Sequence, residues 1–240
     1  MIKYNKNKKN LKENLCIIPA RKGSKGIKNK NIVKFLGKPL IQHTFVTAKK
    51  ISKKFDILVS TDSKKISNLA LKYNFNFLGL RPRSLSGDSV ETKYVLKYEI
   101  KKFEKVLKKK YKNILVLQPT CPFRNPKKIM LSLRKLKSNT YDSVVSVEEV
   151  KTNHPFRMKI FKSKYLTNFI KQKKENTKPR QNLSKIYIRS GSIYLFKRDV
   201  LMRKNSVVGK KCFGLILEGK ETINIDTKNQ LNYLKFKYEK

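Results

Sequence analysis

A segment near the start of the chain combines glycine, serine and positive charge in a way that suits phosphate binding. Residues 19–31 read PARKGSKGIKNKN and follow a short apolar run. Gly23, Ser24 and Gly26 allow tight turns that present backbone N–H groups to phosphate oxygens. The spacing matches neither a Walker loop nor a dinucleotide fingerprint. The residues alone leave two interpretations open: a phosphate-binding loop and a basic surface turn.

The string IIPARKGSKGIKNKNI resembles the signature loop of the acylneuraminate cytidylyltransferases, the CMP-sialic acid synthetase family. Further matching segments follow in the family's order and extend the resemblance over roughly residues 15–235. They are Val59–Asp62, Arg81-Pro82 with Leu85–Asp88, Leu117–Arg124 (LQPTCPFR), Ser143–Val147, His154–Phe156, Arg180-Gln181, Arg189–Tyr194 and Asn224–Thr227.

The resemblance implies an enzyme that transfers CMP from CTP to the anomeric hydroxyl of a nine-carbon α-keto acid sugar. Pyrophosphate is released, and the product serves lipopolysaccharide or capsule biosynthesis. The sugar type stays open between sialic, legionaminic and pseudaminic acids. Because the attacking oxygen meets the α-phosphorus in line with the leaving group, catalysis is mainly positioning and charge neutralisation.

The resemblance also implies which side chains bind the nucleotide. Arg21 and Lys30 would hold the triphosphate, and Asn31 would contact the nucleotide or its ribose. Arg81 and Gln118 would lie near the base and the sugar. The nucleotide-binding set is Arg21, Gly23, Ser24, Lys30, Asn31, Arg81 and Gln118, and the catalytic set is Arg21, Lys30 and Asp226.

Asp226 is the first candidate for a metal ligand, with Asn224 second. Mg²⁺ commonly bridges one or two carboxylates and nucleotide phosphates, and the family carries Asp-Ile-Asp where this chain has Asn224-Ile225-Asp226. Residues 224 and 226 of a strand share a face, so Asn224 offers a neutral oxygen but no second charge. Asp62 is better suited to cap a helix.

On the sugar side, the resemblance implies Gln118, Arg180, Gln181 and Tyr194. A guanidinium pairs bidentately with a carboxylate, which suits Arg180. Two departures from the family affect the site. Lys22 replaces a glycine, where a positive φ would be uncomfortable, and Ser190 replaces an asparagine of the sugar-side motif.

The elements that must hold these residues alternate strictly between strand and helix over residues 15–147. Continuous apolar strands joined by helical crossovers predict a doubly wound, mostly parallel α/β sheet. The family resemblance implies that this sheet is similar to that of the nucleotide-diphospho-sugar transferases. Ligands then bind beyond the carboxyl ends of the strands. The expected strands are 15–18, 57–60, 75–79, 113–117, 143–147, 186–196, 215–217 and 223–225, and the expected helices are one from residue 40, 64–73, 89–110, 126–137 and 227–238.

We expect a disordered basic tail over residues 1–14 and one nucleotidyltransferase domain over 15–240. Residues 150–186 are polar and lysine-rich and interrupt the alternation. They predict an inserted arm or lid, and the resemblance implies that this arm serves homodimerisation.

The chain's charge favours anionic ligands without identifying them. Among 240 residues, 59 are Lys or Arg against 16 Asp or Glu, a formal net charge of +43. A polyanion-binding surface explains this excess, and so does compositional bias, since lysine is spread along the whole chain and arginine is scarce. We favour the bias and expect no specific nucleic-acid partner. Alternatives are a nucleotidyltransferase with another base or acceptor, a basic nucleic-acid-binding protein and an inactive binding module.

The apolar runs and the cysteines bear on location. No run of 18 apolar residues occurs, so we expect no membrane span. Three distant cysteines fit a reducing cytoplasm.

Overall fold

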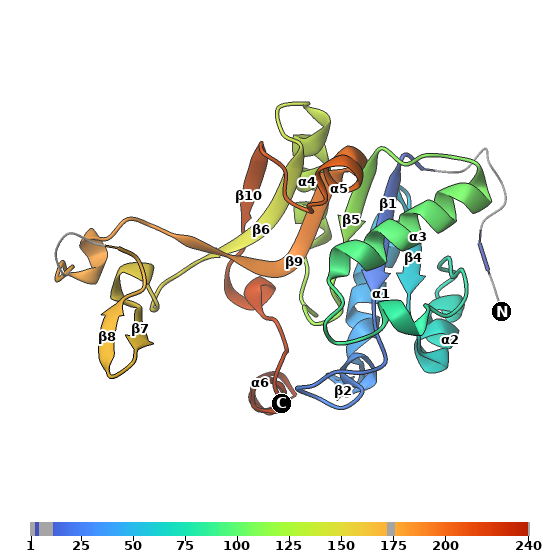
Figure 1. Ribbon diagram of the computed structural model, residues 1–240. Coiled ribbons are helices and arrows are strands. Elements are labelled where there is room, and N and C mark those ends of the chain that lie inside the picture. The colour runs from blue at the N-terminus through green and yellow to red at the C-terminus, as the bar shows by residue number, and fades with distance from the viewer. Residues whose placement is uncertain (1–2, 5–11, 172–175, 240) are drawn as a thin grey trace.

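A six-stranded sheet forms the centre of the molecule in the computed structural model, which describes residues 3–4, 12–171 and 176–239 (Figure 1). Its strand order is β10-β6-β9-β5-β1-β4. Strand β9 is antiparallel to both of its neighbours, whereas the pairs β1–β4, β1–β5 and β10–β6 are parallel. The predicted doubly wound, mostly parallel fold is therefore confirmed. The strands are β1 (Asn14–Pro19), β4 (Phe55–Ser60), β5 (Asn113–Val116), β6 (Ser143–Glu149), β9 (Tyr187–Lys197) and β10 (Cys212–Ile216).

Helices cover both faces of the sheet, which explains why residues Leu15–Ile18 of β1 are all apolar. Cys16 and Ile18 belong to a core cluster with side chains of α1, α2 and α4, whereas Leu15 and Ile17 belong to a second cluster with α3 and α5. Alternate residues of one strand thus enter opposite cores. The helices are α1 (Leu40–Ile51), α2 (Lys64–Lys72), α3 (Thr92–Leu107), α4 (Pro126–Lys137), α5 (Arg198–Lys204) and α6 (Lys228–Tyr238). No helix within the described ranges is long and apolar enough to cross a membrane.

An arm leaves the sheet between β6 and β9 and protrudes from the rest of the molecule (Figure 1). It carries the hairpin β7 (Lys159–Lys162) and β8 (Tyr165–Asn168), whose strands pair antiparallel. Phe161 and Tyr165 on this hairpin are each 76 % exposed. The shorter elements of the chain are β2 (Lys34–Phe35), β3 (Lys38–Pro39) and the 3₁₀ turns Lys30–Ile32, Arg83–Leu85, Pro155–Arg157, Arg180–Asn182 and Gly219–Thr222.

Two expected strands are wrong. Residues 75–79 form isolated bridges, because Asn74 and Gly79 both take positive φ and leave little extended chain between them. Residues 223–225 join no ladder, and the Ile225 N–H donates instead to the Thr120 carbonyl at 2.8 Å.

One predicted helix is longer than the observed helix, and one observed helix was not predicted. The helix expected over 89–110 covers 92–107, since Lys108 turns into the left-handed region and ends it. Helix α5 was not expected at all.

Most of the expected basic tail, residues 1–14, lies outside the described residues. Of its described part, Lys3 bridges Phe77, and Asn14 already begins β1.

Candidate active site

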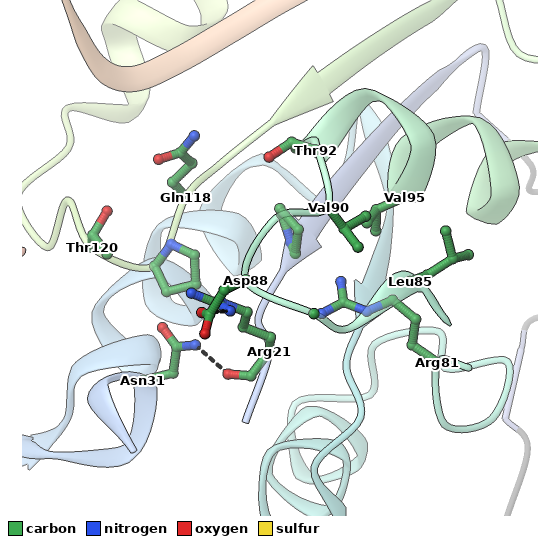
Figure 2. Close-up of a pocket in the computed structure, with 13 residues that line it drawn as sticks. Arg21, Asn31, Arg81, Leu85, Asp88, Val90, Thr92, Val95, Gln118 and Thr120 are labelled. Carbon is green, nitrogen blue, oxygen red and sulfur yellow. Dashed lines mark hydrogen bonds and ion pairs between the residues drawn. The ribbon is translucent and has the colours of Figure 1, made fainter. Parts of the chain in front are cut away.

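A cavity of about 280 Å³ lies at the carboxyl ends of β1 and β5 (Figure 2). This is the edge at which a doubly wound sheet binds its ligands. Four of the predicted site residues, Arg21, Asn31, Arg81 and Gln118, line it. The remaining lining residues are Pro19, Leu85, Gly87, Asp88, Val90, Thr92, Val95, Pro119 and Thr120.

The loop after β1 is held in place by side-chain hydrogen bonds to its backbone. The side-chain amide of Asn31 donates to the Arg21 carbonyl at 2.8 Å, and the Lys22 N–H donates to Asp62 Oδ1 at 2.6 Å. Asp62 therefore anchors the loop and caps no helix, because Ser63 caps α2. Lys22 does not adopt a positive φ, so the expected strain at this position is wrong.

Arg21 faces Asp88 across the cavity, and Figure 2 shows their ion pair beside Asn31. The Arg21 side chain is 32 % exposed and that of Asp88 is 43 % exposed. Ion pairs this exposed contribute little stability. The guanidinium of Arg21 is therefore available to a stronger anion.

Arg81 lies deeper in the wall of the same cavity. Its guanidinium donates to the hydroxyls of Ser60 and Ser86 at 3.4 and 3.3 Å, and Ser60 donates to Glu99 Oε1 at 2.8 Å. Burial lowers the pKa of Arg81 and raises the pKa of Glu99. The site thus contains a buried cation that shares a hydroxyl with a buried acid.

Lys30, Asn224 and Asp226 form a second group outside this cavity's lining. Lys30 Nζ lies 2.8 Å from Asp226 Oδ1, and the amide of Asn224 donates to Asp226 Oδ2 at 2.6 Å. A Cβ at Gly26 would clash with the Asp226 carbonyl, so a glycine is required where the loop crosses this segment.

Few side chains at the site could act as metal ligands. The part of the chain that the structure describes holds no cluster of three His, Cys, Asp or Glu side chains that could bind a metal ion. Asp226 is a single carboxylate with a side chain that is 54 % exposed. Such a carboxylate fits Mg²⁺ where substrate phosphates complete the coordination.

A second cavity of about 350 Å³ shares Gln118 and Thr92 with the first. Tyr194, Arg189 and Ser206 also line it, and burial raises the pKa of Tyr194. Arg189 was not predicted as a site residue, although it begins the family-like segment Arg189–Tyr194. The molecule therefore has two adjoining cavities that meet at the amide of Gln118.

The other predicted residues lie elsewhere. Gly23 and Ser24 belong to the loop but line neither cavity. Gln181 is exposed on a 3₁₀ turn of the arm, and the side chain of Arg180 on the same turn is outside the described atoms. Ser190 is buried, and its hydroxyl donates to Ser146 Oγ at 2.7 Å, so it faces β6.

Comparison with known proteins gives a family match along nearly the whole chain. The family described as "Cytidylyltransferase" matches residues 15–234. Post-translational flagellin modification protein B of Campylobacter coli is 29 % identical over 226 residues, covering 94 % of this chain and 95 % of the relative. CMP-N,N'-diacetyllegionaminic acid synthase of Legionella pneumophila is 33 % identical over 215 residues, covering 89 % and 90 %. Pseudaminic acid cytidylyltransferase of Campylobacter jejuni is 26 % identical over 227 residues, covering 95 % and 97 %.

Solved structures with low identity share the fold. A CMP:2-keto-3-deoxy-manno-octonic acid synthetase complexed with CTP superposes with a TM-score of 0.63 at 17 % identity, covering 94 % of this chain and 98 % of that one. The 4-diphosphocytidyl-2C-methyl-D-erythritol synthase of Anaerococcus prevotii gives 0.61 at 16 % identity, covering 95 % and 97 %.

Proposed function

The chain belongs to the cytidylyltransferase family, and from that premise we propose that it transfers CMP from CTP to the anomeric hydroxyl of a nine-carbon α-keto acid sugar. Pyrophosphate is the second product. The observation that carries the proposal is the pair of cavities joined at Gln118, one walled by Arg21 and Arg81 and the other by Arg189 and Tyr194. A donor and an acceptor bound side by side in this way are positioned for in-line displacement.

CTP is proposed to occupy the first cavity with its triphosphate directed to the loop after β1. Arg21 and Lys30 exchange their partners Asp88 and Asp226 for phosphate oxygens. The N–H groups at Gly23 and Ser24 add neutral donors. Cations aimed at the phosphates stabilise the charge that develops in the transition state.

Mg²⁺ is the proposed cofactor, held by Asp226 with Asn224 beside it. Asp226 would hold the ion, and the bound ion would supply charge neutralisation for the leaving pyrophosphate. Lys30, once released from Asp226, adds a second positive charge to the same phosphates.

The acceptor is proposed to occupy the second cavity. Arg189 presents a guanidinium there, and a planar fork matches the acceptor's carboxylate. The hydroxyl of Tyr194 and the amide of Gln118 are available to the sugar's hydroxyl groups. Relatives named for legionaminic and pseudaminic acids support an acidic nine-carbon acceptor. We propose surface-glycan synthesis in the cytoplasm as its setting.

A homodimer built through the arm is part of the proposal. The exposed Phe161 and Tyr165 need cover, and a cavity of about 1040 Å³ at the root of the arm combines Glu148, Glu149 and Glu218 with apolar side chains such as Ile188. The hairpin of a second copy, with its lysines and aromatic rings, complements that cavity in charge and polarity. Sedimentation of Phe161→Asp should show more monomer than the parent at equal concentration.

The decisive experiment measures pyrophosphate release from each of the four NTPs with a panel of keto-acid sugars. We expect release with CTP and a nine-carbon acceptor, and little with either alone. A clear preference for GTP, ATP or UTP contradicts the cytidylyl assignment. Transfer to a sugar phosphate in place of a keto acid contradicts the acceptor assignment.

A further inference from the structure

A buried guanidinium lies at the end of the segment that follows β5. Arg124 is 9 % exposed, and no carboxylate of the described residues pairs with it. Burying a charge without a counter-ion costs stability unless its donors are well satisfied. Burial accordingly lowers the pKa of Arg124. The donors go to three backbone carbonyls and one hydroxyl, those of Gln118, Cys121, Ser192 and Thr44.

These bonds join three separate elements through one planar group. Two of the acceptors are the backbone carbonyls of Gln118 and Cys121. These two residues are the ends of a turn, in which the Cys121 N–H donates to the Gln118 carbonyl at 3.3 Å. The other two reach the Ser192 carbonyl in β9 and the Thr44 hydroxyl in α1, each at 2.9 Å. The turn at 118–121 is therefore fixed against both β9 and α1.

The same turn carries Gln118, which is assigned to substrate binding, and contacts the segment that carries Asp226. Gln118 begins it and joins the two cavities. The carbonyl of Thr120, within it, accepts from the Ile225 N–H at 2.8 Å, and Ile225 stands between Asn224 and Asp226. A rotation of the turn would displace the Gln118 amide and the Asp226 carboxylate together.

We propose that Arg124 is a positioning residue for CMP transfer, acting through the 118–121 turn on Gln118 and on the 224–226 segment. This inference rests on the proposed function for the roles of Gln118 and Asp226. A lysine at this position would keep the charge but not the rigid fork of donors. Its single ammonium cannot reach the carbonyls at both ends of the turn and Ser192 in the same geometry.

The test compares Arg124→Lys with Arg134→Lys, an exposed arginine on α4 that serves as the matched control. Hydrogen–deuterium exchange of the Ile225 amide is the first readout, because it needs no substrate. We expect faster exchange in Arg124→Lys and parent-like exchange in Arg134→Lys. The second readout is kinetics, in which kcat should fall about 10²-fold, as misplacement of catalytic groups by an ångström does. The KM for CTP should change much less.

Thr44→Val keeps the proposal testable if Arg124→Lys does not fold. It removes one acceptor and preserves volume, so we expect a smaller fall in kcat and a smaller gain in exchange. Parent-like exchange at Ile225 and kcat within twofold of the parent in the folded variants would overturn the proposal. If the parent transfers no CMP, the proposed function fails, whereas exchange at Ile225 still reports on Arg124.

Discussion

At the scale of single residues, two cations assigned to the triphosphate are each paired with an acid in the structure without nucleotide. Arg21 contacts Asp88, and Lys30 contacts Asp226. The acids in both pairs are about half exposed, so solvent screens the attraction and little free energy is lost on exchange. A triphosphate offers more negative charge than one carboxylate. The pairs therefore hold the side chains near their working positions without blocking the site.

Arg21→Ala should reduce catalysis far more than Lys22→Ala. Arg21 lines the first cavity, whereas Lys22 is exposed and is anchored through its backbone N–H. Losing one aimed charged donor costs at least ~2 kcal/mol of transition-state stabilisation. Steady-state kinetics with CTP measures both variants, and equal losses would contradict the assignment of Arg21.

Asp226→Asn should abolish most activity and leave a folded protein, because it removes charge but little volume.

Asn224→Asp tests whether residue 224 belongs to the same metal site. The Asn224 amide now donates to Asp226, so an aspartate there loses that bond and adds repulsion unless a cation lies between the two carboxylates. We expect Asn224→Asp to keep activity and to saturate at lower Mg²⁺ than the parent, which a Mg²⁺ titration measures. A higher Mg²⁺ requirement than the parent's would contradict a metal site shared by residues 224 and 226. A parent-like titration of Asp226→Asn would make Asp62 or Asp88 the next candidate.

At the scale of elements, the strand–loop–helix order around the site follows from local chemistry. Helix α4 covers the predicted residues 126–137, since Asn125 caps it and Pro126 begins it. The cavity could be predicted at the carboxyl ends of β1 and β5, because the alternation of strand and helix predicts a doubly wound sheet and such sheets bind ligands at that edge. Arg189 and the role of Arg124 could not, because β9 enters the sheet antiparallel from the arm and its register depends on tertiary pairing.

The close approach of the backbone at Gly26 to the backbone at Asp226 could not be predicted from the sequence either. Gly23 and Gly26 look alike in the loop after β1, yet only Gly26 lies against the Asp226 carbonyl. Gly23 has nothing within 4 Å of an added Cβ. The difference depends on a segment about two hundred positions further along the chain, which local spacing cannot report.

Gly26→Ala should destabilise the fold, with Gly23→Ala as its control. The new methyl must push the Asp226 segment aside, and overpacking of this kind costs ~1–3 kcal/mol. Gly23→Ala adds its methyl to open space. Denaturant unfolding measures both changes. Equal stability of the two variants would contradict the close approach at Gly26.

Glu99 on α3 should make stability depend on pH. Burial raises its pKa above the ordinary value of 4.5, so the folded state holds the proton more tightly than the unfolded state. Its favourable contribution is complete below 4.5 and is lost as the pH rises through the folded-state pKa. The parent should therefore lose free energy of unfolding relative to Glu99→Gln as the pH rises.

Denaturant titrations at several pH values test this, with Glu91→Gln at the exposed start of the same helix as control. If the difference in free energy of unfolding between the parent and Glu99→Gln stays constant with pH, the pKa of Glu99 is not raised in the folded state.

At the scale of the whole molecule, the net charge of +43 attracts any polyanion. We expect RNA and DNA to bind weakly, without sequence preference, and with a steep loss of affinity as salt rises, because counterion release supplies the binding energy. Fluorescence anisotropy at several salt concentrations with unrelated oligonucleotides measures this. A sequence-selective complex that survives physiological salt would favour a nucleic-acid-binding protein.

The ladder between β6 and β9 continues to the last residues before the arm. Glu149 pairs with Tyr187, and the Val150 N–H donates to the Ile186 carbonyl at 3.0 Å. The arm is thus a loop whose two ends are already joined by the sheet, so doubling its length costs only about 0.6 kcal/mol in closure entropy. Its length and sequence can consequently diverge, or be exchanged between relatives by grafting, while the catalytic sheet keeps its geometry.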